Sequence, residues 1–515
     1  MKHVRRTVPV LLTLMLGPVL AAGCQSKSSN PAPSSSTDAK QPVTYKIYMN
    51  RGEVNYPEDG GEGKKLMLEG LNKAGISGVD FKVSLTGGQE YFTKLNLMIA
   101  SGDVPDYFSV DLPTMTKLAG EGLIMPLDDM LKKMPNASKY YKPQDLQAGM
   151  VNGKIYAFPD AIRPEPFNGQ NVNGFVGRLD WLKKIGAGEP KTLDQLYDVL
   201  KAFTMNDPDG NGKKDTYGLG GTKPGAFGSV SGFDGIFGAF GVAPSFWHER
   251  NGTIKMGMVL PETKQALTLL QKWYKEGLID PEFPVTTDKQ LDEKMTNSKV
   301  GIVGKNAWLV QPTNSASYKA LQKLVPGAEL GVIVPPTGPG GSGWPEASPG
   351  GGGLKAVSAK VKDPDRLAKL LDWITNDQPE GGFFLTAYGI EGKDYTFDKA
   401  NNRITQTTDA TALSGRGLSN PVQFIKVVDR RWSPQVTLDA LQKTNEHTMK
   451  NALWTTLPAQ LDYPDLGKLW EEYFIKIVTG EFSVDKWDEF VQKYYSQGGK
   501  EIEQEANAEW KKGKR

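Results

Sequence analysis

A stretch of nine residues, DPDGNGKKD at positions 207–215, carries side chains that are suited to binding a cation. Oxygen-bearing side chains alternate with other residues, and two glycines allow the chain to turn tightly. Hard oxygen donors in such an arrangement are typical of calcium loops. The expected ligands are the side chains of Asp207, Asp209, Asn211 and Asp215 and the main-chain carbonyl of Lys213.

The twelfth position of this loop is Gly218, where an EF-hand has a bidentate glutamate. The alternative interpretation is therefore a surface turn rich in Asp and Asn that binds no metal. The loop joins a predicted helix at 192–203 to the segment TYGLGG at 216–221. This position predicts a structural calcium ion that holds one loop in place, away from the ligand.

Four tryptophans lie in polar, turn-rich segments and are candidates for contact with a sugar. An indole offers a flat apolar face against which the C–H face of a sugar ring can stack. Trp308 is the strongest candidate because it follows the predicted strand KVGIVG, whereas for the others packing in the core is an equally good interpretation. The predicted stacking residues are Trp308, Trp247, Trp344 and Trp432.

Three charged residues follow predicted strands and are candidates for binding the hydroxyl groups of a sugar. Glu53 follows the first strand, Asp111 follows the third, and Arg163 follows the segment FPDAI. Ligands of α/β proteins bind at the carboxyl ends of strands, which favours these positions. The alternative for each is a charge on a solvated loop.

The N-terminus has the pattern of a bacterial lipoprotein. A basic segment, MKHVRR, precedes an apolar stretch that is short and interrupted by proline and glycine, and the stretch ends in LAAGC. Cys24, the only cysteine of the chain, stands where a lipobox requires it. We therefore expect a signal peptide at 1–23, a lipid on Cys24 and a flexible, Ser- and Pro-rich tether at 24–41. Two or more acyl chains on Cys24 would anchor the protein stably to the membrane.

The elements that must position these residues alternate between strand and helix. Predicted strands at 43–50, 79–87 and 104–111 are separated by predicted helices, which indicates an α/β fold with a mostly parallel sheet. A chain of 515 residues exceeds one core, so at least two lobes are expected. Lys and Arg number 61 against 59 Asp and Glu, and this balance argues against nucleic acid as a partner.

Several segments together resemble the extracellular solute-binding lipoproteins of carbohydrate ABC transporters. The matching segments are YFTKLNLMIASGDVPDYF, EGLIMPLDDML, NGKIYAFP, DPDGNGKKDTYGL, KVGIVGKNAW, AYGIEGKDYTF and VTGEFSVDKWDEFV. The resemblance implies a periplasmic-binding-protein-like fold of two α/β lobes with hinge crossings, a helical C-terminal part and an inter-lobe cleft. Lobe one would then comprise residues 42–160 and 353–400, and lobe two residues 161–352 and 401–515.

The same resemblance implies a non-enzymatic monomer at the outer face of the cell membrane. Such a protein captures an oligosaccharide and delivers it to an ABC permease. In similar alginate-oligosaccharide-binding proteins a glutamate follows the last aspartate of the calcium loop, and Thr216 stands there in this chain.

Two other function classes stay open. A surface enzyme that degrades polysaccharides would need paired carboxylates, which sequence spacing cannot reveal. His248 and His447 are the only histidines beyond the signal peptide, so His-based catalysis has little support. A peptide-binding receptor on the same scaffold is the second alternative.

Overall fold

The computed structural model describes most of the chain beyond the predicted tether. The described residues are 41–51, 55–159, 173–225, 227–311, 315–346, 353–425, 431–454 and 457–513. Among them, no helix has both the length and the apolar character needed to cross a membrane.

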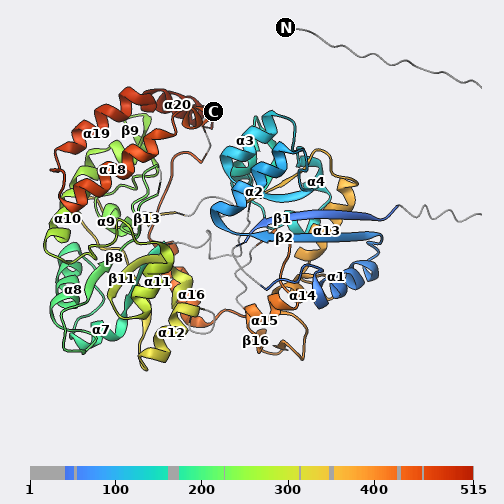
Figure 1. Ribbon diagram of the computed structural model, residues 1–515, viewed down its shortest axis with the longest axis horizontal. Helices are drawn as coiled ribbons and strands as arrows, with labels where there is room; N and C mark the ends of the chain where they lie inside the picture. The colour runs from blue at the N-terminus through green and yellow to red at the C-terminus, as the bar shows by residue number, and fades with distance from the viewer. Residues whose placement is uncertain are drawn as a thin grey trace, which may run out of the picture. The chain divides into compact units, whose positions relative to one another are not determined.

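Five strands form the first sheet, in the order β2-β1-β3-β14-β6 (Figure 1). They are β1 (Val43–Asn50), β2 (Val79–Thr86), β3 (Tyr107–Val110), β6 (Ala157–Pro159) and β14 (Leu354–Val357). Strand β1 pairs in parallel with β2 and β3, as the alternating strand–helix pattern predicts. Strand β14 pairs antiparallel with both β3 and β6, so the sheet is mixed.

Helices cover both faces of the first sheet, and β1 buries side chains against them on both sides. Tyr45 and Ile47 pack with α1 (Gly61–Lys73) and α13 (Pro364–Thr375). Tyr48 packs on the opposite face, with α2 (Gly88–Ala100) and α3 (Leu112–Gly120). This arrangement holds β1 between two packed layers of helices. Its last residue, Asn50, lies at the carboxyl end of the strand.

Four strands form the second sheet, in the order β12-β7-β11-β8. They are β7 (Asn173–Arg178), β8 (Tyr217–Gly220), β11 (Val300–Asn306) and β12 (Leu330–Ile333). Strand β11 pairs in parallel with β8, while β7 runs antiparallel to both β11 and β12. The expectation of a mostly parallel arrangement therefore holds only for β8 and β11 here.

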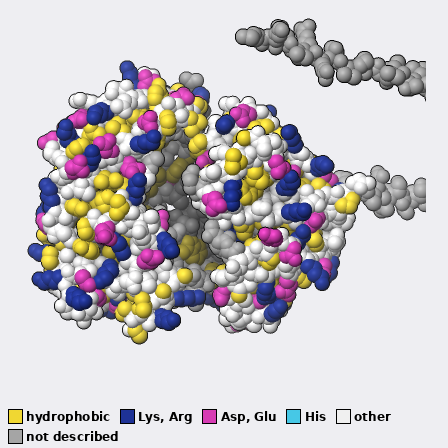
Figure 2. Space-filling model, in the orientation of Figure 1, with side chains coloured by type: hydrophobic (Ala, Val, Ile, Leu, Met, Phe, Trp, Pro, Cys, Tyr) yellow, Lys and Arg dark blue, Asp and Glu magenta, His cyan; other side chains and the backbone are white. Residues whose placement is uncertain are grey.

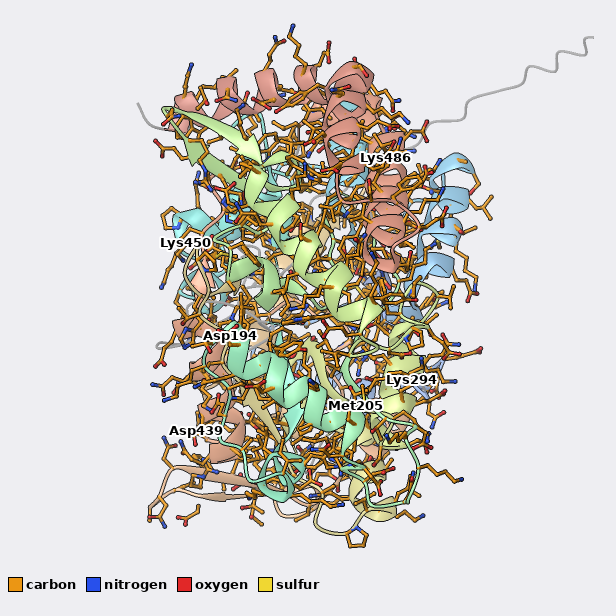
Figure 3. All side chains as sticks on the ribbon, turned by 90° about the vertical axis from the view of Figure 1, so that its left-hand side faces the viewer. Asp194, Met205, Lys294, Asp439, Lys450 and Lys486 are labelled. Atoms are coloured by element: carbon orange, nitrogen blue, oxygen red, sulfur yellow. The ribbon has the colours of Figure 1, made fainter. Side chains whose placement is uncertain are left out.

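The second sheet is likewise covered on both faces, and the C-terminal helices belong to one of these layers. Helices α8 (Leu193–Met205), α10 (Pro261–Lys275) and α18 (Asp465–Thr479) bury apolar side chains on the face of Phe175. Figure 3 views this side and labels Met205, the last residue of α8, after which the predicted calcium loop begins. The other face carries α11 (Asp288–Thr296), α12 (Ala316–Leu324) and α16 (Gln435–Glu446).

The last two helices are α19 (Lys486–Tyr494) and α20 (Lys500–Gly513), and they continue the layer of α18 (Figure 1). In the glycine-rich segment that precedes Trp344, Gly338 and Gly340 pack against the main chain at residues 239–241. A Cβ atom on Gly340 would lie 2.0 Å from the carbonyl carbon of Phe240, so only glycine allows this approach.

An aromatic segment between residues 383 and 432 packs beside the first sheet. It contains α14 (Phe383–Tyr388), the hairpin of β15 (Tyr395–Asp398) and β16 (Arg403–Gln406), and α15 (Ala410–Gly415). Figure 1 shows α14 and α15 beside α1. The carbonyl of Arg416 accepts a hydrogen bond from the main-chain N–H of Gly63 in α1, at 2.8 Å. A Cβ atom on Gly63 would lie 1.8 Å from the carbonyl oxygen of Gly417, so this close packing requires glycine.

These contacts bear on the predicted lobe boundaries. Val422, Phe424 and Ile425 share a buried cluster with β1 and α13, although the predicted division assigned residues 401–515 to the second lobe. The lobe assignment stays a prediction, and we propose that the return segment of the first lobe runs to residue 425 rather than 400.

Candidate functional site

A pocket of about 500 Å³ lies where β1 ends beside the aromatic segment. Its described lining combines aromatic rings, amides, hydroxyls and one guanidinium. The lining residues are Asn50, Arg51, Thr386, Ala387, Tyr388, Gln406, Ala410, Leu413, Leu418, Ser419, Asn420, Gln423, Ile425 and Trp432. Sites for small molecules are concave and mostly apolar with a few placed polar groups, and this pocket has that composition. We call it the β1 pocket.

Two aromatic side chains form one wall of the β1 pocket. The rings of Tyr388 and Trp432 lie with centroids 6.3 Å apart and planes inclined at 44°. Tyr388 is buried against Tyr395, whereas Trp432 is only half-buried at the edge of the same cluster. The indole of Trp432 is therefore held by packing on one side and borders the pocket on the other.

Polar side chains on the loop that follows α15 also line the β1 pocket. The side-chain oxygen of Asn420 accepts hydrogen bonds from the main-chain N–H groups of Val422, at 3.2 Å, and Gln423, at 3.1 Å. This turn holds Gln423 at φ 44°, a region that residues other than glycine rarely adopt. Backbone strain of this kind persists where the surroundings impose it and is common at binding sites.

Arg51, the residue directly after β1, contributes the only charge among the described lining residues of the β1 pocket. Its main-chain N–H donates to the carbonyl of Thr86, and its Nη1 donates to the hydroxyl oxygen of Ser419 at 3.3 Å. The first contact fixes the backbone at the carboxyl end of β1, and the second directs the guanidinium toward the 418–425 loop. A guanidinium in such a position suits hydroxyl or carboxylate oxygens of a ligand.

A partly buried ion-pair network links the aromatic segment to α1. Arg416 bonds to Asp394 at 2.5 Å and to Glu62 of α1 at 2.7 Å. Asp394 is only 1% exposed, and burial alone would raise the pKa of its carboxyl. Hydrogen bonds from Arg416, from the N–H of Ile390 and from Thr408 outweigh burial and hold that pKa below its ordinary value. The network thus fastens the aromatic segment to α1.

The four predicted stacking tryptophans lie in different environments. Trp432 lines the β1 pocket. Trp344 is 0% exposed, and its Nε1 donates to the carbonyl of Thr444 at 2.8 Å. Trp247 is 3% exposed within the core of the second sheet. These two side chains are core residues in this structure, so we do not carry them into the proposed site.

Trp308 lies just beyond the end of β11, as the sequence predicts, in a short 3-10 helix at Ala307–Val310. The side-chain oxygen of Asn306 caps this turn by accepting from the N–H of Trp308 at 2.9 Å. Its ring is half-buried and packs at the edge of the cluster on the α16 face, and it does not line the β1 pocket. Its role in ligand binding stays a prediction.

Asp111 has a structural contact that accounts for its position after β3. Its Oδ1 accepts from the N–H of Thr114 at 2.9 Å and so caps the N-terminus of α3. The other predicted residues, Glu53, Arg163 and the expected lipidation site Cys24, lie outside the described residues.

Sequence reasoning missed Arg51, Tyr388 and Gln423. The strand-end rule that selected Glu53 points equally to Arg51, two residues earlier. Nothing in the local sequence connects Tyr388 or Gln423 with β1, because they come together through the packing of a segment more than three hundred residues away.

The loop at 207–215 forms a dense network around Asp207. Its Oδ1 accepts from the N–H groups of Gly210 and Asn211, each at 3.0 Å, and its Oδ2 accepts from the N–H of Gly212 at 2.9 Å. The bond from Gly212, with the other two, holds the pKa of Asp207 below its ordinary value. The pKa of Asp209 is raised by burial and by the neighbouring carboxyl of Asp207.

The donor set of this loop fits calcium in chemistry, since carboxylates and amides are hard oxygen ligands. The side-chain Nδ2 of Asn211 donates to Asp209 at 2.8 Å and to Asp215 at 3.1 Å, and Lys299 lies 2.5 Å from Asp215. Among the described residues no group of three His, Cys, Asp or Glu side chains is close enough to hold a metal ion. Calcium would therefore need Asn211 to present its oxygen and Asp215 to exchange Lys299 for the ion.

Comparisons with known proteins bear on the fold and the family. Over its whole length the chain is 26% identical to the polygalacturonan/rhamnogalacturonan-binding protein YtcQ of Bacillus subtilis, with 99% of each chain covered. It is 31% identical to the fructooligosaccharide ABC transporter substrate-binding protein FusA of Streptococcus pneumoniae, over 53% of this chain and 52% of FusA.

Two solved structures share the fold. FusA in complex with kestose superposes with a TM-score of 0.70 at 20% identity, covering 92% of this chain and 99% of FusA. The alginate-binding protein AlgQ2, solved without calcium ion, superposes with a TM-score of 0.68 at 21% identity, covering 93% of this chain and 100% of AlgQ2. The model of one family, described as bacterial extracellular solute-binding protein, matches residues 57–380. This chain belongs to the family of bacterial extracellular solute-binding proteins.

Proposed function

We propose that this protein captures an oligosaccharide outside the cell and delivers it to an ABC importer. The observation that carries the proposal is the β1 pocket, where Tyr388 and Trp432 meet the amide-bearing loop of Asn420 and Gln423. Aromatic rings suit the apolar faces of sugar rings, while amides and a guanidinium suit their hydroxyl groups. The relatives YtcQ, a polygalacturonan/rhamnogalacturonan-binding protein, and FusA, a fructooligosaccharide-binding protein, support the same class of ligand.

The capture step rests on two lobes that close around the ligand. A ligand that contacts both lobes binds the closed state better than the open state and so shifts the population toward closure. Trp308, at the end of β11, is our candidate for the contact on the second lobe. We propose further that Cys24 carries the lipid that holds the protein at the cell surface, beside its permease.

Calcium has a structural place in this proposal. Bound at the loop after α8, the ion would neutralise the crowded carboxylates of Asp207, Asp209 and Asp215 and hold the loop in a single conformation. AlgQ2 has been solved without calcium ion and FusA as an EF-hand mutant with bound fructo-nystose, which supports testing this loop.

A binding panel tests the proposal. The mature protein is titrated by calorimetry with kestose, maltotriose, trigalacturonate and three unrelated tripeptides, and each incubation is then analysed by chromatography. We expect binding of at least one oligosaccharide, no binding of peptides and no products of cleavage. Binding confined to peptides would favour the receptor alternative, and release of shorter sugars would favour the enzyme alternative.

A further inference from the structure

A second pocket, of about 950 Å³, lies between α3 and the C-terminal helix α20. One wall comprises α3 and the segment 147–153, where Leu112 and Val151 pack in the core cluster on the Tyr48 face of the first sheet. The other wall comprises α20 and the segment 451–454, where Leu453 packs with the core of the second sheet. Figure 2 shows the surface hollowed between the part that carries α3 and the part that carries α20. We call this space the α3–α20 pocket.

The α3–α20 pocket lies at the same edge of the first sheet as the β1 pocket. Strands β1 and β3 are adjacent and parallel, so their carboxyl ends meet at one edge. Asn50, the last residue of β1, lines the β1 pocket, and Leu112, just beyond the end of β3, lines the α3–α20 pocket. Ligands of α/β proteins bind outside this edge. A ligand that extends along it from the β1 pocket therefore reaches toward the α3–α20 pocket.

Trp454 is held in a fixed orientation at the α3–α20 pocket. Its Nε1 donates to Oε1 of Glu346 at 3.3 Å, and its half-buried ring packs edge-to-face with Phe246, with centroids 5.1 Å apart and planes inclined at 76°. Glu346 is itself fixed, since Oε1 accepts from the N–H of Asn451 at 3.0 Å and Oε2 lies 2.5 Å from Nζ of Lys450. The indole is thus supported at its nitrogen and on one side, and it also borders the pocket.

Polar groups accompany this ring on both walls. The charged side chains of α20 have partners within their own wall, since Glu509 pairs with Lys512 and Glu505 accepts from the N–H of Ala459 at 2.8 Å. An indole face and neutral amides suit the apolar face and the hydroxyl groups of a sugar ring. The amides that line the pocket belong to Gln147, Asn152 and Asn451.

We propose that the α3–α20 pocket is a second sugar subsite, in which Trp454 stacks on a unit of the oligosaccharide other than the one held in the β1 pocket. The ligand is then an oligosaccharide long enough to extend beyond the β1 pocket along the sheet edge. Because the two walls belong to different core clusters, a unit bound between them contacts both lobes and favours closure. This inference rests on the proposed function, because it specifies the length of the oligosaccharide and the residue that recognises it.

The test compares oligosaccharides of increasing length. Fructo-, malto- and galacturono-oligosaccharides are each titrated by calorimetry against the mature protein, from the disaccharide to the hexasaccharide. For a series that binds, we expect Kd to fall by about 5- to 50-fold between the shortest and the longest member, since the longer chain gains one aromatic stacking contact.

Substitutions then assign this gain to the second subsite. Trp454→Ala should remove the gain with length and leave the affinity of the shortest member unchanged, whereas Trp454→Phe, which keeps a ring face, should retain part of the gain. Trp432→Ala is the control in the β1 pocket and should weaken every member by the same factor. Gln147→Ala removes an exposed amide from the opposite wall, so it should leave Tm unchanged and weaken the longer members alone.

Three outcomes would count against the inference. Equal affinity at every length would show that no unit is bound beyond the β1 pocket. An equal loss at every length in Trp454→Ala would make Trp454 a structural residue. Both results would leave the proposed function intact, because an oligosaccharide still binds, whereas binding of no member of any series would overturn the inference and the proposed function together.

Discussion

Trp344 and Trp432 provide a direct test of how the structure separates packing from binding. Both residues lie in polar, turn-rich sequence, yet Trp344 is 0% exposed and Trp432 borders the β1 pocket. Trp344→Ala should lower the free energy of unfolding by about 3–5 kcal/mol, the range for removing a large aromatic side chain from a core. The carbonyl of Thr444 would also lose the hydrogen bond from the indole Nε1, which places the expected loss toward the upper end.

Trp432→Ala should behave in the opposite way. Its half-buried ring leaves a smaller cavity, so we expect less than about 2 kcal/mol of lost stability. The loss of a stacking face should weaken ligand binding by at least about 1 kcal/mol, or about fivefold in Kd.

Urea unfolding followed by circular dichroism measures the first quantity, and calorimetry with a ligand identified in the panel measures the second. Trp344→Phe serves as a milder control that keeps most of the ring volume. If Trp344→Ala stays within 1 kcal/mol of the wild-type protein and weakens binding more than Trp432→Ala does, the assignment of these two residues is reversed and the β1 pocket is not the ligand site.

Three further perturbations test the supports of the fold and the anchor. Because the pKa of Asp394 is lowered in the folded protein, its contribution to stability is complete above its ordinary pKa and is lost as the pH falls through the folded value. The free energy of unfolding, measured as a function of pH, should therefore begin to fall near pH 5. Arg416→Met should diminish this pH dependence and should lower the free energy of unfolding by about 1–3 kcal/mol at pH 7. Calcium at a hundredfold excess over Kd should add about 2.7 kcal/mol, seen as a higher Tm that EDTA reverses and Asp207→Ala abolishes; identical melting curves would leave the loop as a metal-free turn. Cys24→Ser should release the protein from membranes into the medium, and retention on the membrane would exclude the lipid anchor.

The elements near the N-terminus could be predicted from sequence because their signals are local. Val43–Asn50 alternates between buried and exposed positions over its first residues, and the structure places β1 at these bounds. The predicted helix at 192–203 likewise corresponds to α8, which Thr192 caps by accepting from the N–H of Gln195. Periodicity and caps are properties of neighbouring residues, so they survive without knowledge of the tertiary fold.

The environment of a side chain could not be predicted in the same way, because distant segments decide it. The segment around Trp344 is rich in glycine and reads as an exposed loop, yet the indole is covered by α16, a hundred residues further along the chain. The direction of β14 is a second example. Its antiparallel pairing with β3 and β6 depends on where the chain returns to the sheet.

The position of the β1 pocket bears on the order of events in ligand capture. Its described lining residues all belong to the end of β1 or to the segment 386–432. Arg416 fastens that segment to α1, the helix that packs with β1. These walls are therefore held together by contacts that do not depend on the second sheet. We infer that the ligand is first bound here and that closure follows, since only contacts made in addition, such as one to Trp308, can favour the closed state over the open one. A ligand too short to reach beyond the β1 pocket would then bind without closing the lobes, whatever its affinity.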